Sequence, residues 1–140
     1  MIVYEHDFYP KTKIFRHFHM YCGTQDQGLW NMSTVVFALL TSYDAMNLLI
    51  TKDYNIHILY SFYLLYGPNP NNSFYFVHTT NESGIFRTET IDNNAGDQIS
   101  SILDQNEKIH TTYYKWNFQE LYYSTNESGT WETNLIYTYP

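Results

Sequence analysis

The sequence predicts an all-β fold built from four-stranded antiparallel units of about 45 residues, and three observations lead to that prediction. A polar phrase recurs along the chain, so the polypeptide contains internal repeats. The composition favours strands over helices, because Ala is scarce and the chain contains 15 Tyr. Short runs of β-branched and aromatic residues alternate with turn sequences, a pattern that is typical of hairpins.

The repeat is clearest in the phrases VHTTNESGIF, residues 77–86, and YYSTNESGTW, residues 122–131, which start 45 residues apart. A weaker copy, YCGTQDQGLW, occupies residues 21–30 and starts 56 residues before the middle copy. Part of the longer interval is a loop rich in Pro, Gly and Asn, and repeat architectures tolerate such insertions. The structural positions shared by the copies are Gly28, Gly84 and Gly129, each followed two residues later by Trp30, Phe86 or Trp131.

The first unit, residues 1–30, is predicted to be incomplete. The runs MIVYEHDF and IFRHFHMYCG have the composition of the middle strands of a unit that lacks its first strand. The next apolar run, VVFALL, is ambiguous between a buried strand and a short helix. It is too short to span a bilayer, so we expect no membrane insertion.

The second and third units are predicted to hold four strands each. The second covers residues 31–91 and carries an insertion at residues 64–73, and the third covers residues 92–140. The expected strands are residues 46–51, 56–63, 74–79 and 85–91 in the second unit, and 98–104, 108–114, 120–125 and 130–136 in the third.

The recurring polar phrase is predicted to be the turn of a hairpin. Residues 126–128 can form a type I turn, after which Gly129 adopts the left-handed conformation and produces a one-residue bulge. Positive φ is accessible to Gly at little cost, which accounts for its presence in each copy. Trp131 would then anchor the outgoing strand by burying a large aromatic surface.

Four antiparallel strands in a repeat of this length are typical of a β-propeller blade, so we expect a partial β-propeller in a single domain, with about two and a half blades. The phrases TNESGTW, ETIDNNAGDQISSILDQNEKIHTTYY and ELYYSTNESGTWETNLI resemble bacterial and archaeal surface propellers of the neuraminidase-repeat-like, or sialidase-like, type. The resemblance covers residues 21–136 and includes an (I/V)-H-x-x-Y-Y strand and a T-x-x-(I/V)-D exit. It departs from the Asp-box of true sialidases. It implies an extracellular or cell-surface location, although no secretory signal is visible.

Catalysis of the sialidase kind is not expected from this chain. The resemblance implies three arginines that clamp a carboxylate, together with a tyrosine nucleophile, a glutamate and an aspartic acid. The chain contains only Arg16 and Arg87. We therefore expect a protein that is not an enzyme and has no cofactor.

Charge and cysteine content exclude other classes. The net charge of −7 makes nucleic acid and anionic membrane surfaces unfavourable partners. The lone cysteine, Cys22, excludes an internal disulfide framework and a zinc site built on cysteines.

Candidate ligand contacts are aromatic. Trp116 and Phe118 in the KWNFQ loop, with Tyr113 and Tyr114 just before it, can stack on a sugar or contact a protein partner. The alternative is that the loop aromatics pack over the edge of the blade.

The histidines allow a metal site, but structural roles are favoured. His57 and His110 recur at equivalent positions, which indicates a hydrogen bond within each blade. His17 and His19 form an H-x-H pair that would need a third ligand from Glu5, His6 or Asp7, and half-exposed strand histidines are the favoured interpretation. Residues 92–97 contain oxygen ligands for calcium, yet a connection between blades needs the same turn residues. We therefore assign no metal. Four sequons occur, at Asn31, Asn71, Asn81 and Asn126.

Three functions are compatible with this organisation. The leading one is a non-enzymatic binding or surface-interaction module of propeller type, with carbohydrate or protein as its ligand. The second is a fragment of a sialidase-like glycoside hydrolase that lacks its catalytic blades. The third is a self-assembling structural subunit, because an incomplete ring leaves large apolar faces open. A homo-oligomer or a longer propeller would cover those faces.

Overall fold

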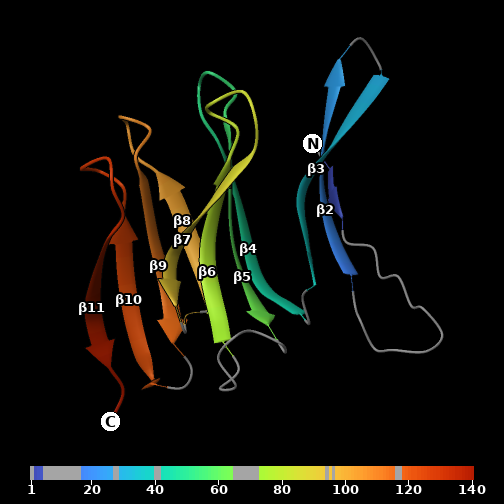
Figure 1. Ribbon diagram of the computed structural model, residues 1–140. Helices are drawn as coiled ribbons and strands as arrows, with labels where there is room; N and C mark the ends of the chain where they lie inside the picture. The colour runs from blue at the N-terminus through green and yellow to red at the C-terminus, as the bar shows by residue number, and fades with distance from the viewer. Residues whose placement is uncertain are drawn as a thin grey trace, which may run out of the picture. The chain divides into compact units, whose positions relative to one another are not determined.

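The computed structural model describes residues 2–4, 17–26, 29–39, 42–64, 73–93, 95, 97–115 and 118–140. Within these ranges the regular structure consists of strands β1 to β11, without an α-helix (Figure 1). The all-β prediction is therefore confirmed. The chain divides into two compact units, residues 1–41 and residues 42–140, each of which is described by itself. The part of the chain that the structure describes contains no helix with the length and apolar character needed to cross a membrane.

The first unit contains one three-stranded antiparallel sheet in the order β1-β2-β3. Its strands are β1 (Ile2–Tyr4), β2 (His17–Asp26) and β3 (Leu29–Leu39). The sheet extends past the predicted blade boundary at residue 30, because β3 pairs with β2 along its whole length. The ambiguous VVFALL run is strand as far as Leu39, and residues 31–39 belong to this sheet rather than to the next.

Residues 42–140 contain two four-stranded antiparallel sheets, which we call the middle sheet and the third sheet. In each, consecutive strands lie side by side, so the predicted pair of four-stranded units is confirmed. The middle sheet comprises β4 (Ser42–Ile50), β5 (Ile56–Leu64), β6 (Ser73–Thr80) and β7 (Arg87–Asn93). The third sheet comprises β8 (Asp97–Leu103), β9 (Ile109–Lys115), β10 (Glu120–Thr125) and β11 (Glu132–Thr138).

One hydrophobic core joins the middle and third sheets face to face. Leu59 and Phe76 of the middle sheet are fully buried against Ile109 and Tyr113 of the third. The rings of Phe76 and Tyr113 lie 4.7 Å apart between centroids. Alternation along each strand sends the intervening residues to the opposite face of its sheet. The core is completed by the buried Ala95 and Ile99 and by the half-buried Ala45, Leu49, Ile91, Leu103, Tyr122 and Trp131.

The TNESG phrases form the predicted hairpin turn. The Gly129 N–H donates to the Asn126 carbonyl oxygen at 2.9 Å, and the φ of Gly129 is +91°. The Asn126 side chain then fixes a neighbouring strand, because its Oδ1 accepts a hydrogen bond from the Ile109 N–H at 2.8 Å. The copy at residues 77–86 repeats all three features. The repeated Asn and Gly therefore have structural roles in both turns.

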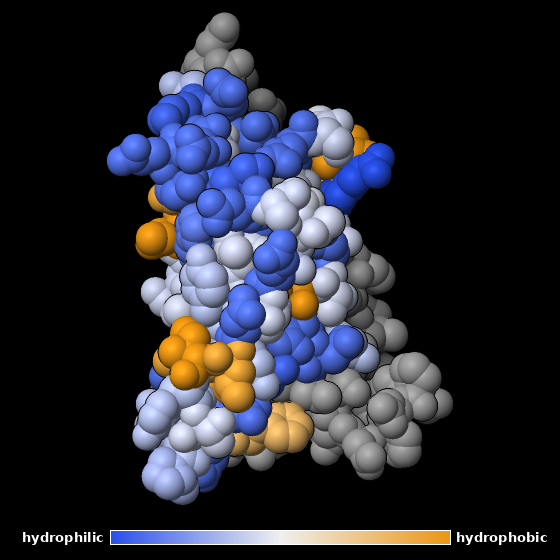
Figure 2. All heavy atoms as spheres, turned by 90° about the vertical axis from the view of Figure 1, so that its left-hand side faces the viewer, coloured by the Kyte–Doolittle hydropathy of each residue, from blue (hydrophilic) through white to orange (hydrophobic). Residues whose placement is uncertain are grey.

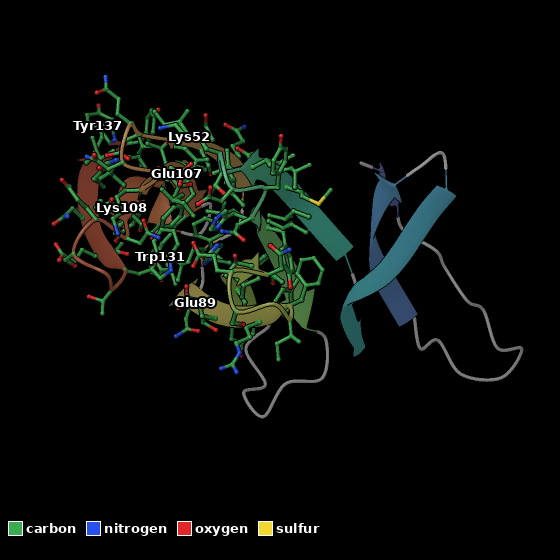
Figure 3. The ribbon with its side chains drawn as sticks, turned by 90° about the horizontal axis from the view of Figure 1, so that it is seen from above. Lys52, Glu89, Glu107, Lys108, Trp131 and Tyr137 are labelled. Atoms are coloured by element: carbon green, nitrogen blue, oxygen red, sulfur yellow. The ribbon has the colours of Figure 1, made fainter. Side chains whose placement is uncertain are left out.

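The turns between β4 and β5 and between β8 and β9 are also equivalent. Each contains a non-glycine residue with a left-handed backbone, Tyr54 at φ +63° and Glu107 at φ +62°. The two turns touch, since the Lys52 N–H donates to Glu107 Oε1 at 2.5 Å. Figure 3 shows Lys52 and Glu107 close together at this end of the unit. The repeated turns thus contribute a polar contact between the two sheets.

Candidate functional sites between and outside the two sheets

Asp92, near the end of β7, links the middle sheet to the third sheet. Its Oδ2 accepts a hydrogen bond from the Tyr113 hydroxyl and lies 2.7 Å from Lys115 Nζ. Burial and the hydrogen bond to Asp92 raise the pKa of Tyr113. Asp92 is the acidic residue of the T-x-x-(I/V)-D exit, so this contact gives the motif a physical reason.

Lys115 also lies over the Tyr122 ring, with Nζ 4.2 Å from the ring centroid. The Tyr122 hydroxyl donates to Glu120 Oε2 at 2.8 Å. That hydrogen bond, helped by burial, raises the pKa of Tyr122 to about 12. Lys115 therefore contacts both a carboxylate and an aromatic ring, and the Tyr122 hydroxyl has a hydrogen-bond acceptor.

The side chain of Asn47 forms hydrogen bonds with the backbone at the free edge of β8. Its Oδ1 accepts a hydrogen bond from the Ser101 N–H at 2.7 Å, and its Nδ2 donates to the Ile99 carbonyl oxygen at 3.1 Å. Since β8 is the edge strand of the third sheet, the Asn47 amide takes the place of a neighbouring strand. The two sheets are thus linked by polar contacts as well as by the core.

A polar chain crosses from the middle sheet to the third sheet. His57 Nδ1 lies 2.9 Å from His78 Nε2, and His78 Nδ1 lies 2.9 Å from Glu89 Oε1. The same Glu89 oxygen accepts a hydrogen bond from Trp131 Nε1 at 2.7 Å, and Figure 3 shows these two residues on neighbouring segments. At the other end, His57 Nε2 lies 3.5 Å from Glu82 Oε1.

Two side chains of this polar chain, His57 and Glu89, have pKa values shifted from their ordinary values. Burial and then the neighbouring His78 lower the pKa of His57, against the opposing charges of Glu82 and Glu107. Burial alone would raise the pKa of Glu89, but the hydrogen bonds from His78 and Trp131 outweigh it, so the Glu89 pKa is lowered. Glu89 is therefore held as a carboxylate.

The third sheet carries a different version of the same arrangement. His110 occupies the position of His57, and Tyr123 occupies that of His78. His110 Nδ1 lies 2.6 Å from the Tyr123 hydroxyl oxygen, and His110 Nε2 lies 3.7 Å from Asp104 Oδ2. Each recurring histidine therefore has a hydrogen bond inside its own sheet, as the repeat indicated.

The face of the third sheet that points away from the middle sheet is rich in tyrosine. Strand alternation and register place Tyr114, Leu121 and Tyr123 on this outer face, with Ile102 beside His110 and Tyr137 opposite Leu121. Ile102 is 63% exposed. The side of the unit seen in Figure 2, where β11 lies, is mostly hydrophilic with small separate hydrophobic groups.

The structure separates the four aromatic residues that the sequence suggested as ligand contacts. Tyr113 is fully buried between the two sheets, so its ring serves packing. Tyr114 lies on the outer face and packs edge-on against Tyr139, with 5.8 Å between ring centroids. Phe118 is exposed, and Trp116 lies outside the described residues.

The candidate metal positions are not assembled in the described ranges. There, no group of three or more His, Cys, Asp and Glu side chains is placed to hold an ion. His17 and His19 lie on β2 two residues apart, whereas Glu5, His6 and Asp7 fall outside the described residues. In the 92–97 segment, Asp92 is engaged by Tyr113 and Lys115.

The described repeat landmarks lie in or beside the hairpin strands. Trp30 is on β3, Phe86 directly precedes β7, and Gly28 lies outside the described residues. Of the sequons, Asn31 is on β3, Asn71 lies outside the described ranges, and Asn81 and Asn126 hold the TNESG turns through their side-chain oxygens.

No protein-family model matches the sequence, and no curated protein matches it. Sequence reasoning missed His78, Glu89, Asn47 and the role of Asp92. An alignment of the two repeats could have drawn attention to His78 and Glu89. At these two positions the third sheet has Tyr123 and Asn134, so the middle sheet differs from its copy there.

Proposed function

We propose that the chain is a non-enzymatic interaction module of β-propeller type and that it binds protein through the outer face of the third sheet. One observation carries the proposal. In the middle sheet, the residues at the equivalent positions of the repeat form the face that packs against the third sheet. Tyrosine is enriched at protein interfaces, and this face carries Tyr114, Tyr123 and Tyr137.

The equivalence holds strand by strand. Leu49 of β4 pairs with His57 and belongs to the core between the sheets, and Ile102 of β8 pairs with His110 at the same place in the repeat. In β6 the corresponding core residue is Phe76, whose place in β10 is taken by Leu121. The middle sheet covers these positions with a neighbouring sheet, whereas Ile102 is exposed on the third.

The partner is a second copy of this chain. In each molecule the inner face of the third sheet is already buried against its own middle sheet, so a second copy contributes the outer face of its third sheet. Two copies related by a two-fold axis would bury Ile102 and the neighbouring tyrosines of both outer faces against each other, and such self-complementary contacts are typical of dimers.

Light scattering on a size-exclusion column tests the proposal. We expect the chain to form a discrete oligomer, and we expect Ile102→Glu to shift it to monomer, because a charge would enter the contact. Ile85→Glu is the matched control, since Ile85 is 62% exposed but lies in the β6–β7 turn. A wild-type monomer would overturn self-association, and binding on a glycan array would then support the carbohydrate alternative. Equal behaviour of the two variants would place the contact elsewhere.

A further inference from the structure

The hydrogen positions of the polar chain follow from its two ends. A carboxylate is only an acceptor, so both groups that contact Glu89 Oε1 must donate to it. Trp131 Nε1 always carries a hydrogen, and His78 Nδ1 must carry one as well. A neutral His78 then has a bare Nε2, which can only accept.

The neutral state leaves one buried atom without a hydrogen bond. Because His78 Nε2 accepts, the His57 Nδ1 that lies 2.9 Å away must donate. A neutral His57 then has a bare Nε2, which faces another acceptor, Glu82 Oε1, at 3.5 Å. His57 is only 1% exposed, and its Nε2 is the single buried side-chain polar atom among the described residues that lacks a partner. An arrangement of this kind is costly.

We propose that His57 and His78 form a binding site for one proton, at the contact between the middle and third sheets. A proton taken from solvent adds to His57 Nε2, which then donates to Glu82. No other bond forms or breaks, and the positive charge lies between two carboxylates, Glu82 and Glu89. The completed chain of hydrogen bonds ends at Trp131 of the third sheet.

Burial and the neighbouring His78 lower the pKa of His57, whereas the surrounding carboxylates favour one proton on the pair. Three acidic groups face the pair from different segments: Glu82 in the β6–β7 turn, Glu89 on β7 and Glu107 in the β8–β9 turn. Arg87 lies in the same cross-strand row as His57 and is exposed. Two imidazolium rings would bring two N–H donors together at 2.9 Å in a buried site, so the geometry has room for one added proton and not two.

Solvent can deliver this proton although both rings are buried. The side chains of Glu82 and Glu89 are more than half exposed, and each contacts one ring of the pair. The carboxylates therefore connect the buried rings with water at both ends of the chain.

The third sheet supplies a natural comparison. Tyr123 and Asn134 replace His78 and Glu89 there, and a tyrosine hydroxyl satisfies the histidine without a second imidazole. The double substitution His78→Tyr with Glu89→Asn gives the middle sheet this arrangement. It removes the proposed site with residues that the same fold already accepts.

Histidine-ring and indole nitrogen NMR of the whole chain between about pH 8 and about pH 5 tests the proposal, since histidine charge changes in this range. We expect both rings to be Nδ1–H tautomers at high pH. On acidification, both rings and the Trp131 Nε1–H should shift with one midpoint that corresponds to one proton. In the double variant, the Trp131 shift should be lost.

Three outcomes would overturn the proposal. The first is independent titration of the two rings to two imidazolium ions. The second is an Nε2–H tautomer of His57 at high pH, and the third is a Trp131 signal that shifts equally in the double variant. His110→Gln is a control that should leave the midpoint unchanged, because His110 bonds within the third sheet. If the double variant does not fold, the wild-type tautomers alone decide.

Discussion

Loss of the Asp92 carboxylate should weaken the packing of the middle sheet against the third sheet. Asp92→Ala removes the acceptor of the fully buried Tyr113 hydroxyl and the ion-pair partner of Lys115. Leaving buried polar groups unsatisfied costs more than a hydrogen bond contributes, so we expect the free energy of unfolding to fall by about 2 to 3 kcal/mol. Urea denaturation measures this change.

Two further variants separate the contributions at Asp92. Asp92→Asn keeps an acceptor for Tyr113 but loses the charge opposite Lys115, so its loss should be smaller than that of the alanine variant. Glu132→Ala, at an exposed position on β11, should change stability by less than about 0.5 kcal/mol. An Asp92→Ala protein as stable as wild type would contradict a structural role for this contact.

At the scale of elements, the repeated turns permit a pair of substitutions with opposite effects. Gly129→Ala adds a Cβ into open space but forces a left-handed backbone at φ +91° on a non-glycine residue, so it should destabilise the protein by about 1 kcal/mol. Tyr54 is 83% exposed and already has φ +63°, so Tyr54→Gly should stabilise the protein slightly. Thermal unfolding compares the two, and shifts of the same sign would be inconsistent with the turn geometry.

The sequence predicted the strands of the middle and third sheets well, because each strand carries a local signal. The TNESG turn, with Gly129 and Asn126, marks one hairpin, and β-branched and aromatic runs mark the strands. β3 continues past the predicted boundary at residue 30. The weaker copy of the turn phrase at residues 21–30 marks the β2–β3 hairpin, but no local signal marks where its outgoing strand ends. The chain from His57 to Trp131 was not predictable for a related reason. Its members come from two sheets, and only packing brings them together.

At the scale of the whole chain, the abundance of tyrosine predicts sensitivity to alkaline pH. Burial raises the pKa of Tyr60 and Tyr113, and the hydrogen bond to Glu120 raises that of Tyr122 to about 12, all from an ordinary value of 10.0. Above pH 10.0 the folded state therefore holds protons that the unfolded chain has released. Stability should be constant in these groups below that pH and should fall as the pH rises toward the folded values.

Urea denaturation at a series of pH values, with tyrosinate absorbance as a second signal, checks this dependence. Tyr122→Phe should make the decline less steep, because it removes one raised pKa while keeping the ring under Lys115. Tyr54→Phe, in the exposed β4–β5 turn, should leave the slope unchanged. A free energy of unfolding that is constant from about pH 10 to about pH 12 would contradict the prediction, because a raised tyrosine pKa requires the folded state to lose stability over that interval.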